Sequence, residues 1–264
     1  MKVKEIIKIM EEKIAPPNTA EDWDSPGLKT GSMNSDINRV MTCLDVTVDV
    51  VKEAQEKGCD MIISHHPLIF KSISDVTQET APAVYAAVRA GITVFSAHTN
   101  LDYAPGGIND SLAEAVGLVD IIRDVDGKHT YGSTIRPMTV RDLVEDIKAR
   151  LKVPHVKVVL PKGKSLDDVV SKVGVSCGAF DHRNYWFEPC GIEVLVTGEI
   201  HHFDCIELSR ENVITIGAGH LFTEYPGVIN LSKNLKGYGI DCIYSESDIN
   251  LYPRVPRGHC RRVR

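Results

Sequence analysis

The sequence predicts an α/β protein with two α/β lobes and mixed, largely parallel sheets. Two features of the chain carry this prediction: short apolar runs alternate with amphipathic helical segments, and several helical segments end at a glycine. Of the 264 residues, 43% are hydrophobic and 25% are charged, as in ordinary globular proteins. A chain of this length can bury a substantial core.

The first lobe begins with an amphipathic helix from Met1 to Ile14, because apolar residues recur at helical spacing with Lys and Glu between them. It stops at Pro16 and Pro17, and a long loop is expected from Asn18 to Gly31. Strands and helices then alternate. The expected strands are Val40–Leu44, Met61–Ser64 and Ile92–Ser96, and the expected helices are Val48–Lys57, Pro82–Ala90 and Ile108–Val116.

A second round of alternation follows a polar stretch, Asp124 to His129, which marks a weak boundary between the two expected lobes. Helices are expected at Val140–Leu151 and near Phe203–Arg210. The expected strands are Ser133–Arg136, His155–Leu160, Val173–Cys177, Glu193–Val196, Val213–Ile216 and Asp241–Tyr244. We therefore predict an N-terminal lobe of residues 1–126 and a C-terminal lobe of residues 127–264, with the final strand free to return to the first lobe.

Composition excludes several classes of function. The net charge is −6, and the last eleven residues hold five arginines and no acid, so the rest of the chain is still more acidic. Nucleic-acid binding is not expected, since phosphate contacts need a basic face. The arginine-rich end, residues 254–264, is expected to be a solvated terminus. No apolar run is long enough to span a membrane and no signal segment is recognisable, so a cytoplasmic protein is expected.

Candidate metal ligands stand at the ends of the apolar runs. His65 and His66 follow one expected strand, and Asp102 lies in the loop after another. In open α/β sheets, side chains at the carboxyl ends of strands converge on a crevice. His220 and Glu224 share one helical face if a helix begins near Leu221. Together these five residues predict two divalent ions in the cleft between the lobes, with a carboxylate such as Asp102 placed to bridge them.

Each of these motifs also has a purely structural explanation, as a surface histidine pair, a helix-capping acid or a hydrogen-bonded pair on a helix. Their joint placement favours a metal site. Imidazole and carboxylate donors without thiolate favour zinc, iron, manganese, cobalt or nickel. The seven cysteines lack a Cys-x-x-Cys pair and are expected to be free thiols. His202, Glu199 and His98 form a second set, suited to proton transfer or to orienting ligands.

With these residues in place, the chain resembles the dinuclear-metal family of GTP cyclohydrolase 1 type 2 homologues, the NGG-interacting-factor-three-like proteins. Six motifs stand in the family's order: Trp23-Asp24 through Gly27-Leu28, Cys43-Leu44-Asp45, Ser64 through Phe70, Ala97 through Asp102, Thr197-Gly198-Glu199, and Gly219-His220 through Thr223-Glu224. The resemblance implies the same five ligands for two ions, a toroidal homohexamer with sites facing an internal cavity, and the short, two-lobed form. Ser176 through Phe180 depart from a stretch that is often richer in glycine in this family.

Two functions follow from this pattern. The first is a metal-dependent hydrolase of an unidentified small substrate, because paired metal ions can activate water and stabilise a developing negative charge. Opening of a GTP ring would use the same chemistry. The alternative is a non-catalytic metal-binding ring that stores or delivers metal, or that acts as an interaction partner. Five protein ligands shared by two ions would leave coordination positions open, which favours catalysis.

Overall fold

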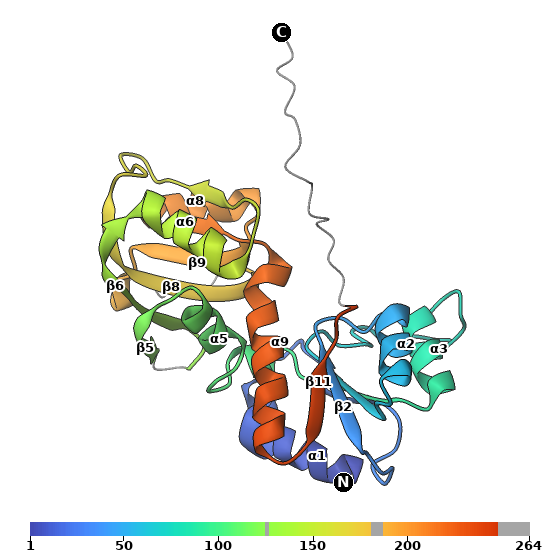
Figure 1. Cartoon of the computed structure of the whole chain (residues 1–264). Helices are drawn as coiled ribbons and strands as arrows, with labels where there is room; N and C mark the ends of the chain where they lie inside the picture. Colours follow the sequence, from blue (N-terminus) through green and yellow to red (C-terminus); the bar gives the residue numbers. More distant parts are fainter. Residues whose placement is uncertain (125–126, 181–186, 248–264) are drawn as a thin grey trace, which may run out of the picture.

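The computed structural model describes residues 1–124, 127–180 and 187–247. The predicted lobe boundary after residue 126 and the arginine-rich end, 254–264, lie outside the described residues. Figure 1 shows two lobes, each built on a β-sheet, with one long helix between them. The predicted α/β class with mixed sheets is confirmed. Among the described residues, no helix combines the length and the apolarity that crossing a membrane requires.

The first sheet has five strands in the order β1-β4-β3-β2-β11. Its strands are β1 (Gly27–Thr30), β2 (Arg39–Cys43), β3 (Met61–Ser64), β4 (Thr93–Ser96) and β11 (Asp241–Tyr244). The four strands from β4 to β11 are parallel, and β1 pairs antiparallel with β4. Because β11 pairs with β2, the end of the described chain completes the sheet that the first half of the chain begins.

Helices precede, connect and follow the strands in the first half of the chain. They are α1 (Val3–Ile9), which continues as the π-helix η1 (Met10–Ile14), the 3-10 helix η2 (Pro17–Thr19), α2 (Val48–Glu56), α3 (Pro82–Ala90), α4 (Thr99–Asp102) and α5 (Ile108–Ala115). The apolar face predicted for the first helix is buried along its whole length. The prediction of a loop from Asn18 to Gly31 is wrong in part, because the last part of this segment forms the strand β1. This strand escapes the pattern since it is short and has no apolar run.

The second sheet has six strands in the order β5-β6-β8-β9-β10-β7. They are β5 (Val119–Arg123), β6 (Thr130–Thr139), β7 (Lys157–Val159), β8 (Val169–Ala179), β9 (Val194–Glu199) and β10 (Ile214–Gly217). Its helices are α6 (Val140–Leu151), α7 (Phe187–Cys190), α8 (His202–Arg210) and α9 (His220–Gly237). The central strands β8, β9 and β10 are parallel, whereas the outer strands pair antiparallel.

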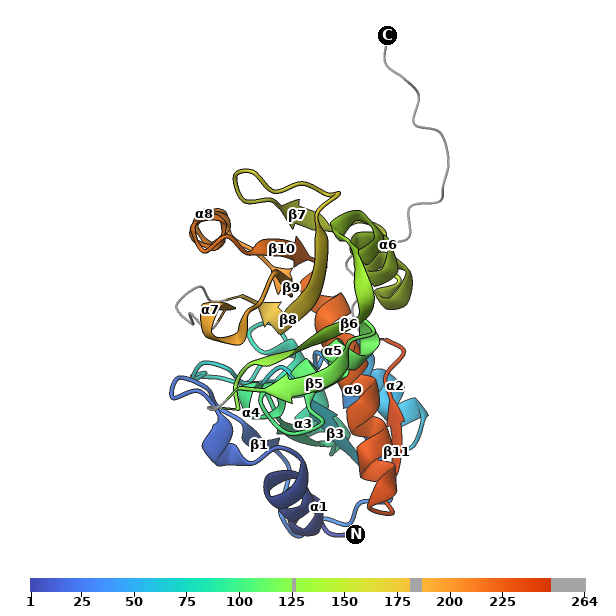
Figure 2. The same cartoon turned by 90° about the vertical axis from the view of Figure 1, so that its left-hand side faces the viewer.

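The lobes share one hydrophobic core. It contains residues from the inner faces of both sheets, such as Val40 and Ile63 in the first and Val173 and Ile216 in the second. Side chains alternate along the strands, so Met41 and Ile62 instead pack under α2 and α3 on the outer face. Helix α9 contacts strands of both sheets and stands between the lobes in both views (Figures 1 and 2). Its first turn therefore lies where the two sheets meet.

Candidate metal site

The first pair of candidate ligands, His65 and His66, follows β3 directly. The amide of His65 donates to the carbonyl of Cys43 at 3.0 Å, and the amide of His66 donates to that of Leu44 at 2.9 Å. The chain then turns, with the Ser64 hydroxyl donating to the carbonyl of His66 at 2.8 Å. This turn brings the two neighbouring rings together, with centroids 5.0 Å apart and planes at 40°. Adjacent residues of a regular strand would point to opposite faces.

The five predicted ligands meet at the start of α9. Nε2 of His65 lies 3.4 Å from Oδ1 of Asp102 and 3.6 Å from Oε1 of Glu224. Nε2 of His66 lies 3.2 Å from Oε2 of Glu224, and Nε2 of His220 lies 3.0 Å from Oε1 of the same carboxylate. Helix α9 begins at His220, so His220 and Glu224 lie one turn apart on one face.

We call the five predicted ligands, together with His98 beside them, the cluster. Each imidazole ring of the cluster is oriented by an oxygen atom of a residue outside the cluster. Nδ1 of each ring faces a carbonyl or carboxylate: Ala97 O at 3.0 Å from His65, Asp45 Oδ1 at 2.8 Å from His66, Asp24 Oδ1 at 2.8 Å from His98, and Glu199 Oε2 at 3.4 Å from His220. Histidines that bind metals show this arrangement, because the outer acceptor fixes the ring and leaves Nε2 for the ion. The imidazole rings are therefore oriented as they are in histidines that bind metal ions.

Two buried polar atoms of the cluster have no hydrogen-bond partner within the described part of the chain. They are Nε2 of His65, whose side chain is fully buried, and Oε2 of Glu224. Buried polar atoms without partners are rare and costly. Two sets of donor atoms, each lying within 4.8 Å of one another, could hold a metal ion: His65, His66 and His98, and His66, His220 and Glu224.

The electrostatics of the cluster also suit a cation. Burial alone lowers the pKa of His66, but the adjoining carboxylates of Asp45 and Glu224 outweigh it and raise this pKa to about 10. Burial would raise the pKa of Glu224, but the surrounding imidazoles hold it well below its ordinary value. Burial raises the pKa of Asp102. The cluster therefore stabilises positive charge on its imidazoles, and a bound metal ion would replace those protons.

His98 belongs to this cluster more closely than the sequence indicated. The ring of His98 lies 5.3 Å from the ring of His65 and 5.7 Å from that of His66. Its partner Asp24 has a fully buried side chain and also accepts hydrogen bonds from the Thr99 amide at 3.0 Å and the Thr99 hydroxyl at 2.6 Å. Burial raises the pKa of Asp24, but these bonds outweigh it and hold the pKa well below its ordinary value. Sequence reasoning placed Asp24 in a family motif but gave it no role at the site.

The other two residues of the predicted proton-transfer set lie farther out. Glu199 ends β9, and its half-exposed carboxylate touches only His220 in the cluster. His202 is an exposed residue at the start of α8. Within the residues that the structure describes, no hydrogen bond or ion pair joins His202 to the cluster. The role of His202 stays a prediction.

Sequence reasoning also missed two residues of β8, Cys177 and Gly178. The buried thiol of Cys177 donates to Oδ1 of Asp102 at 3.1 Å, and burial together with the nearby carboxylates raises its pKa, so it keeps its proton. Gly178 has φ +61°, and a Cβ there would collide with Oε1 of Glu224 and lie 3.3 Å from Nε2 of His220. Both residues fall in the stretch that departs from the family's pattern, so this stretch shapes the cluster.

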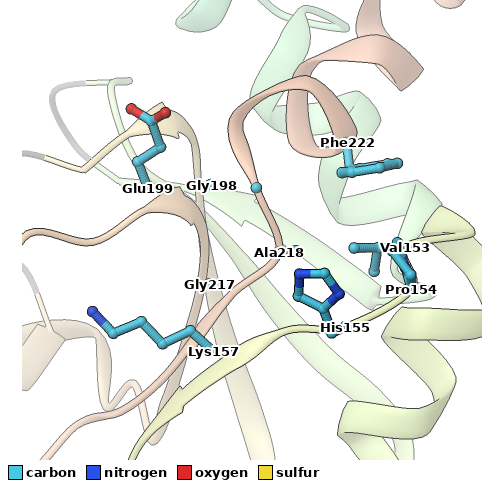
Figure 3. Close-up of a pocket in the computed structure, with 10 residues that line it drawn as sticks. Val153, Pro154, His155, Lys157, Gly198, Glu199, Gly217, Ala218 and Phe222 are labelled. Atoms are coloured by element: carbon cyan, nitrogen blue, oxygen red, sulfur yellow. The ribbon is translucent and has the colours of Figure 1, made fainter. Parts of the chain in front are cut away.

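A cavity of about 200 Å³ lies between the segment that leads into α9 and the segment around β7 (Figure 3). Its floor is the backbone of Gly198 and of Gly217 through Gly219, and Glu199 stands at one side. Lys157 and His155 come from the segment around β7, and Phe222 from the first turn of α9. The Lys157 ammonium donates to the Ile200 carbonyl at 3.1 Å. Because Glu199 contacts His220, the cavity adjoins the cluster.

Comparison with known proteins confirms the resemblance seen in the sequence. The profile of the Duf34/NIF3 (NGG1p interacting factor 3) family matches residues 1–250. A Clostridium acetobutylicum protein called GTP cyclohydrolase 1 type 2 homolog is 31% identical over 247 residues, which cover 90% of each chain. The NIF3-like protein 1 of Drosophila melanogaster is 28% identical over 267 residues, covering 96% of this chain and 89% of its own. The crystal structure of Staphylococcus aureus protein SA1388 superposes with a TM-score of 0.85 at 27% identity, covering 96% of this chain and 98% of its own.

Proposed function

Since the chain belongs to the Duf34/NIF3 family, we propose that it is a hydrolase that binds two divalent metal ions and acts on a small molecule. The ligands in this proposal are those that meet at the start of α9: His65, His66, Asp102, His220 and Glu224. One observation carries the proposal. Two buried ligand atoms, His65 Nε2 and Glu224 Oε2, lie next to the other ligands but have no hydrogen-bond partner within the described chain.

The donor set fits divalent ions of the zinc, iron, manganese, cobalt and nickel group, because it combines imidazole with carboxylate. Bound ions of this kind would activate water and stabilise negative charge in the reaction. The protein's part is to hold the ligands in place. Asp45, Ala97 and Glu199 do so by fixing the imidazole rings of His66, His65 and His220.

His98 and Asp24 are placed to handle the proton of the reaction. Nδ1 of His98 is hydrogen-bonded to Asp24 at 2.8 Å, so Nε2 is the ring nitrogen that remains for proton transfer. The His98 ring lies next to the rings of His65 and His66. A buried carboxylate at one ring nitrogen fixes the tautomer of such an imidazole and its orientation. We therefore assign the accepting and donating of a proton to Nε2 of His98, and a secondary role to Glu199 beside His220.

A small substrate has access to this cluster. His66 and His220 are partly exposed, and the cavity beside Glu199 adjoins His220. A storage site has no need of a cavity beside the ligands, so this access favours catalysis over metal storage or delivery. The name of the Clostridium acetobutylicum relative makes GTP the first compound to test. Opening of its ring lies within the chemistry of a two-metal hydrolase.

The first experiment measures metal content per chain on protein purified without chelator or affinity metal. We expect about two ions in the wild type and a clear loss in Glu224→Gln. The matched control is Glu53→Gln, which neutralises another buried glutamate, on α2, that contacts Lys57 and Ser245 instead of the cluster. If metal stays absent after reconstitution with zinc, manganese, iron, cobalt and nickel, the proposal is wrong.

The second experiment tests catalysis on the metal-loaded protein with a panel of hydrolysable small molecules that includes GTP. Asp24→Asn and His98→Gln should keep their metal and lower turnover by about 10²–10⁴-fold, the usual contribution of a general acid or base. Full metal content without turnover on any compound would support the storage or delivery function. Unchanged turnover in both variants would remove the pair from the reaction.

A further inference from the structure

Two exposed aromatic side chains lie beside the candidate metal site. The ring of Trp23 lies 6.0 Å from that of Phe70, at an interplanar angle of 65°. Both rings also pack edge to face against the His98 imidazole, at 5.9 Å from Trp23 and 6.1 Å from Phe70. We call Trp23 and Phe70 the aromatic lip. Centroid distances of this size are those of favourable aromatic pairs.

The lip is exposed although its residues are of a type that is normally buried. Trp23 is 60% exposed and Phe70 is 49% exposed. Large aromatic rings bury most of their surface in globular proteins, and exposed ones mark places where another molecule binds. The lip is therefore a candidate binding surface.

The Trp23 side of the lip is also held in place by hydrogen bonds. The residues on both sides of Trp23 are tied to α4, since the Glu21 amide donates to the Thr99 hydroxyl at 3.0 Å and Asp24 accepts two bonds from Thr99. The amide of Asp24 donates to the Glu21 carbonyl at 2.9 Å and closes the turn around Trp23. A surface that is fixed in advance loses little conformational freedom when a ligand binds.

The lip is continuous with the metal ligands. The His98 ring that packs against both lip residues lies next to the rings of His65 and His66. The His98 imidazole thus lies between the lip and the rings of His65 and His66. A small molecule that rests on the lip would reach the ligands with an adjoining group.

We propose that the lip binds a flat aromatic or heteroaromatic ring of the substrate, with the hydrolysable group next to that ring placed at the metal ligands. This inference rests on the proposed function and narrows its substrate to ring compounds. Trp23 and Phe70 stand at 65° to each other, so one ring can stack on one of them and meet the other by its edge. Two such contacts correspond to a preference of about tenfold for an aromatic over an aliphatic ring.

The test is calorimetric titration of the zinc-loaded full chain with two hydroxamates that share one chelating group. Benzohydroxamate carries an aromatic ring, and cyclohexanecarbohydroxamate carries an aliphatic ring of similar size. We expect the wild type to bind the aromatic compound about tenfold more tightly, and Trp23→Leu and Phe70→Leu each to lose most of this preference while keeping their zinc. The matched control is Tyr238→Leu, because Tyr238 is 46% exposed but follows the far end of α9, about 27 Å from His220.

Three outcomes overturn the inference. Equal affinity of zinc-loaded wild type for the two hydroxamates, or no binding of either, shows that the lip recognises no ring. A preference that survives in Trp23→Leu, while light scattering shows that this variant no longer assembles, identifies the lip as a contact between copies of the chain. Failure of the wild type to bind zinc or any of manganese, iron, cobalt and nickel is a different result, because it refutes the proposed function itself.

Discussion

Gly178→Ala tests whether the backbone of β8 shapes the candidate metal site. Gly178 has φ +61°, and the added Cβ would collide with Oε1 of Glu224 while lying 3.3 Å from Nε2 of His220. The left-handed conformation alone costs an alanine about 1–2 kcal/mol relative to glycine. Relief of the collision requires Glu224 to move, and this carboxylate also faces His65 and His66.

The matched control is Gly58→Ala, at φ +68° after α2. A Cβ at Gly58 would have no atom within 4 Å, so this variant carries the same backbone cost without the collision. For a chain of this size, 1–2 kcal/mol lowers Tm by roughly 2–8 °C. We expect this decrease in Gly58→Ala, with full metal content. Gly178→Ala should show at least the same decrease and lose half or more of its metal.

The assay pairs a thermal melt with metal analysis on the same preparation. Thermal stability reports the backbone cost that both variants share, and metal content reports the position of Glu224. Gly178→Ala with the metal content of Gly58→Ala would refute the reasoning, since it would show that the carboxylate seen against Gly178 is not at a ligand position.

Three further predictions concern stability and affinity. Burial raises the pKa of Glu53, but hydrogen bonds from Lys57, Ser245 and two backbone amides outweigh it and hold the pKa at about 2, against an ordinary 4.5. This shift corresponds to about 3 kcal/mol of folding stability. That stability is present above pH 4.5 and lost as the pH falls towards 2, so urea unfolding should show the wild type and Glu53→Gln converging over this range. Zinc at one hundred times its Kd should stabilise the wild type by about 2.7 kcal/mol in the same assay, and Glu224→Gln much less. Cys177→Ala should weaken metal binding by about 10–100-fold in a chelator competition while Cys177→Ser retains it, because serine keeps the donor to Asp102.

Much of the fold could be predicted from the pattern of apolar residues. Runs such as Met61–Ser64 are buried on both faces, and these are the strands that hydrophobicity reveals. The apolar pattern does not predict the edge strands β1 and β5, because these strands are not buried on both faces. Val119 and Ile122 of β5 are exposed, and β1 has one buried residue, so neither shows the pattern of a core strand.

The site was predictable where it depends on residue type and position along a strand, and not where it depends on distant partners. His65, His66 and Asp102 are recognisable because they follow strands. Their supporting residues lie far away in sequence: Asp24 is 74 residues from His98, and Cys177 is 75 residues from Asp102. The folding of the first lobe creates the first pair and the packing of the two lobes creates the second, so local pattern cannot reveal them.

The cluster and the residues that support it come from both lobes. His65 and His66 belong to the first sheet, whereas Glu224 sits on α9, which packs on both sheets. Gly178 of the second sheet limits the space around Glu224, and Cys177 beside it donates to Asp102 of the first lobe. Neither lobe alone contains a complete set of ligands and supports. Metal ions bound here would join chain segments that only the folded pair of lobes brings together, so metal binding and the packing of the lobes stabilise each other.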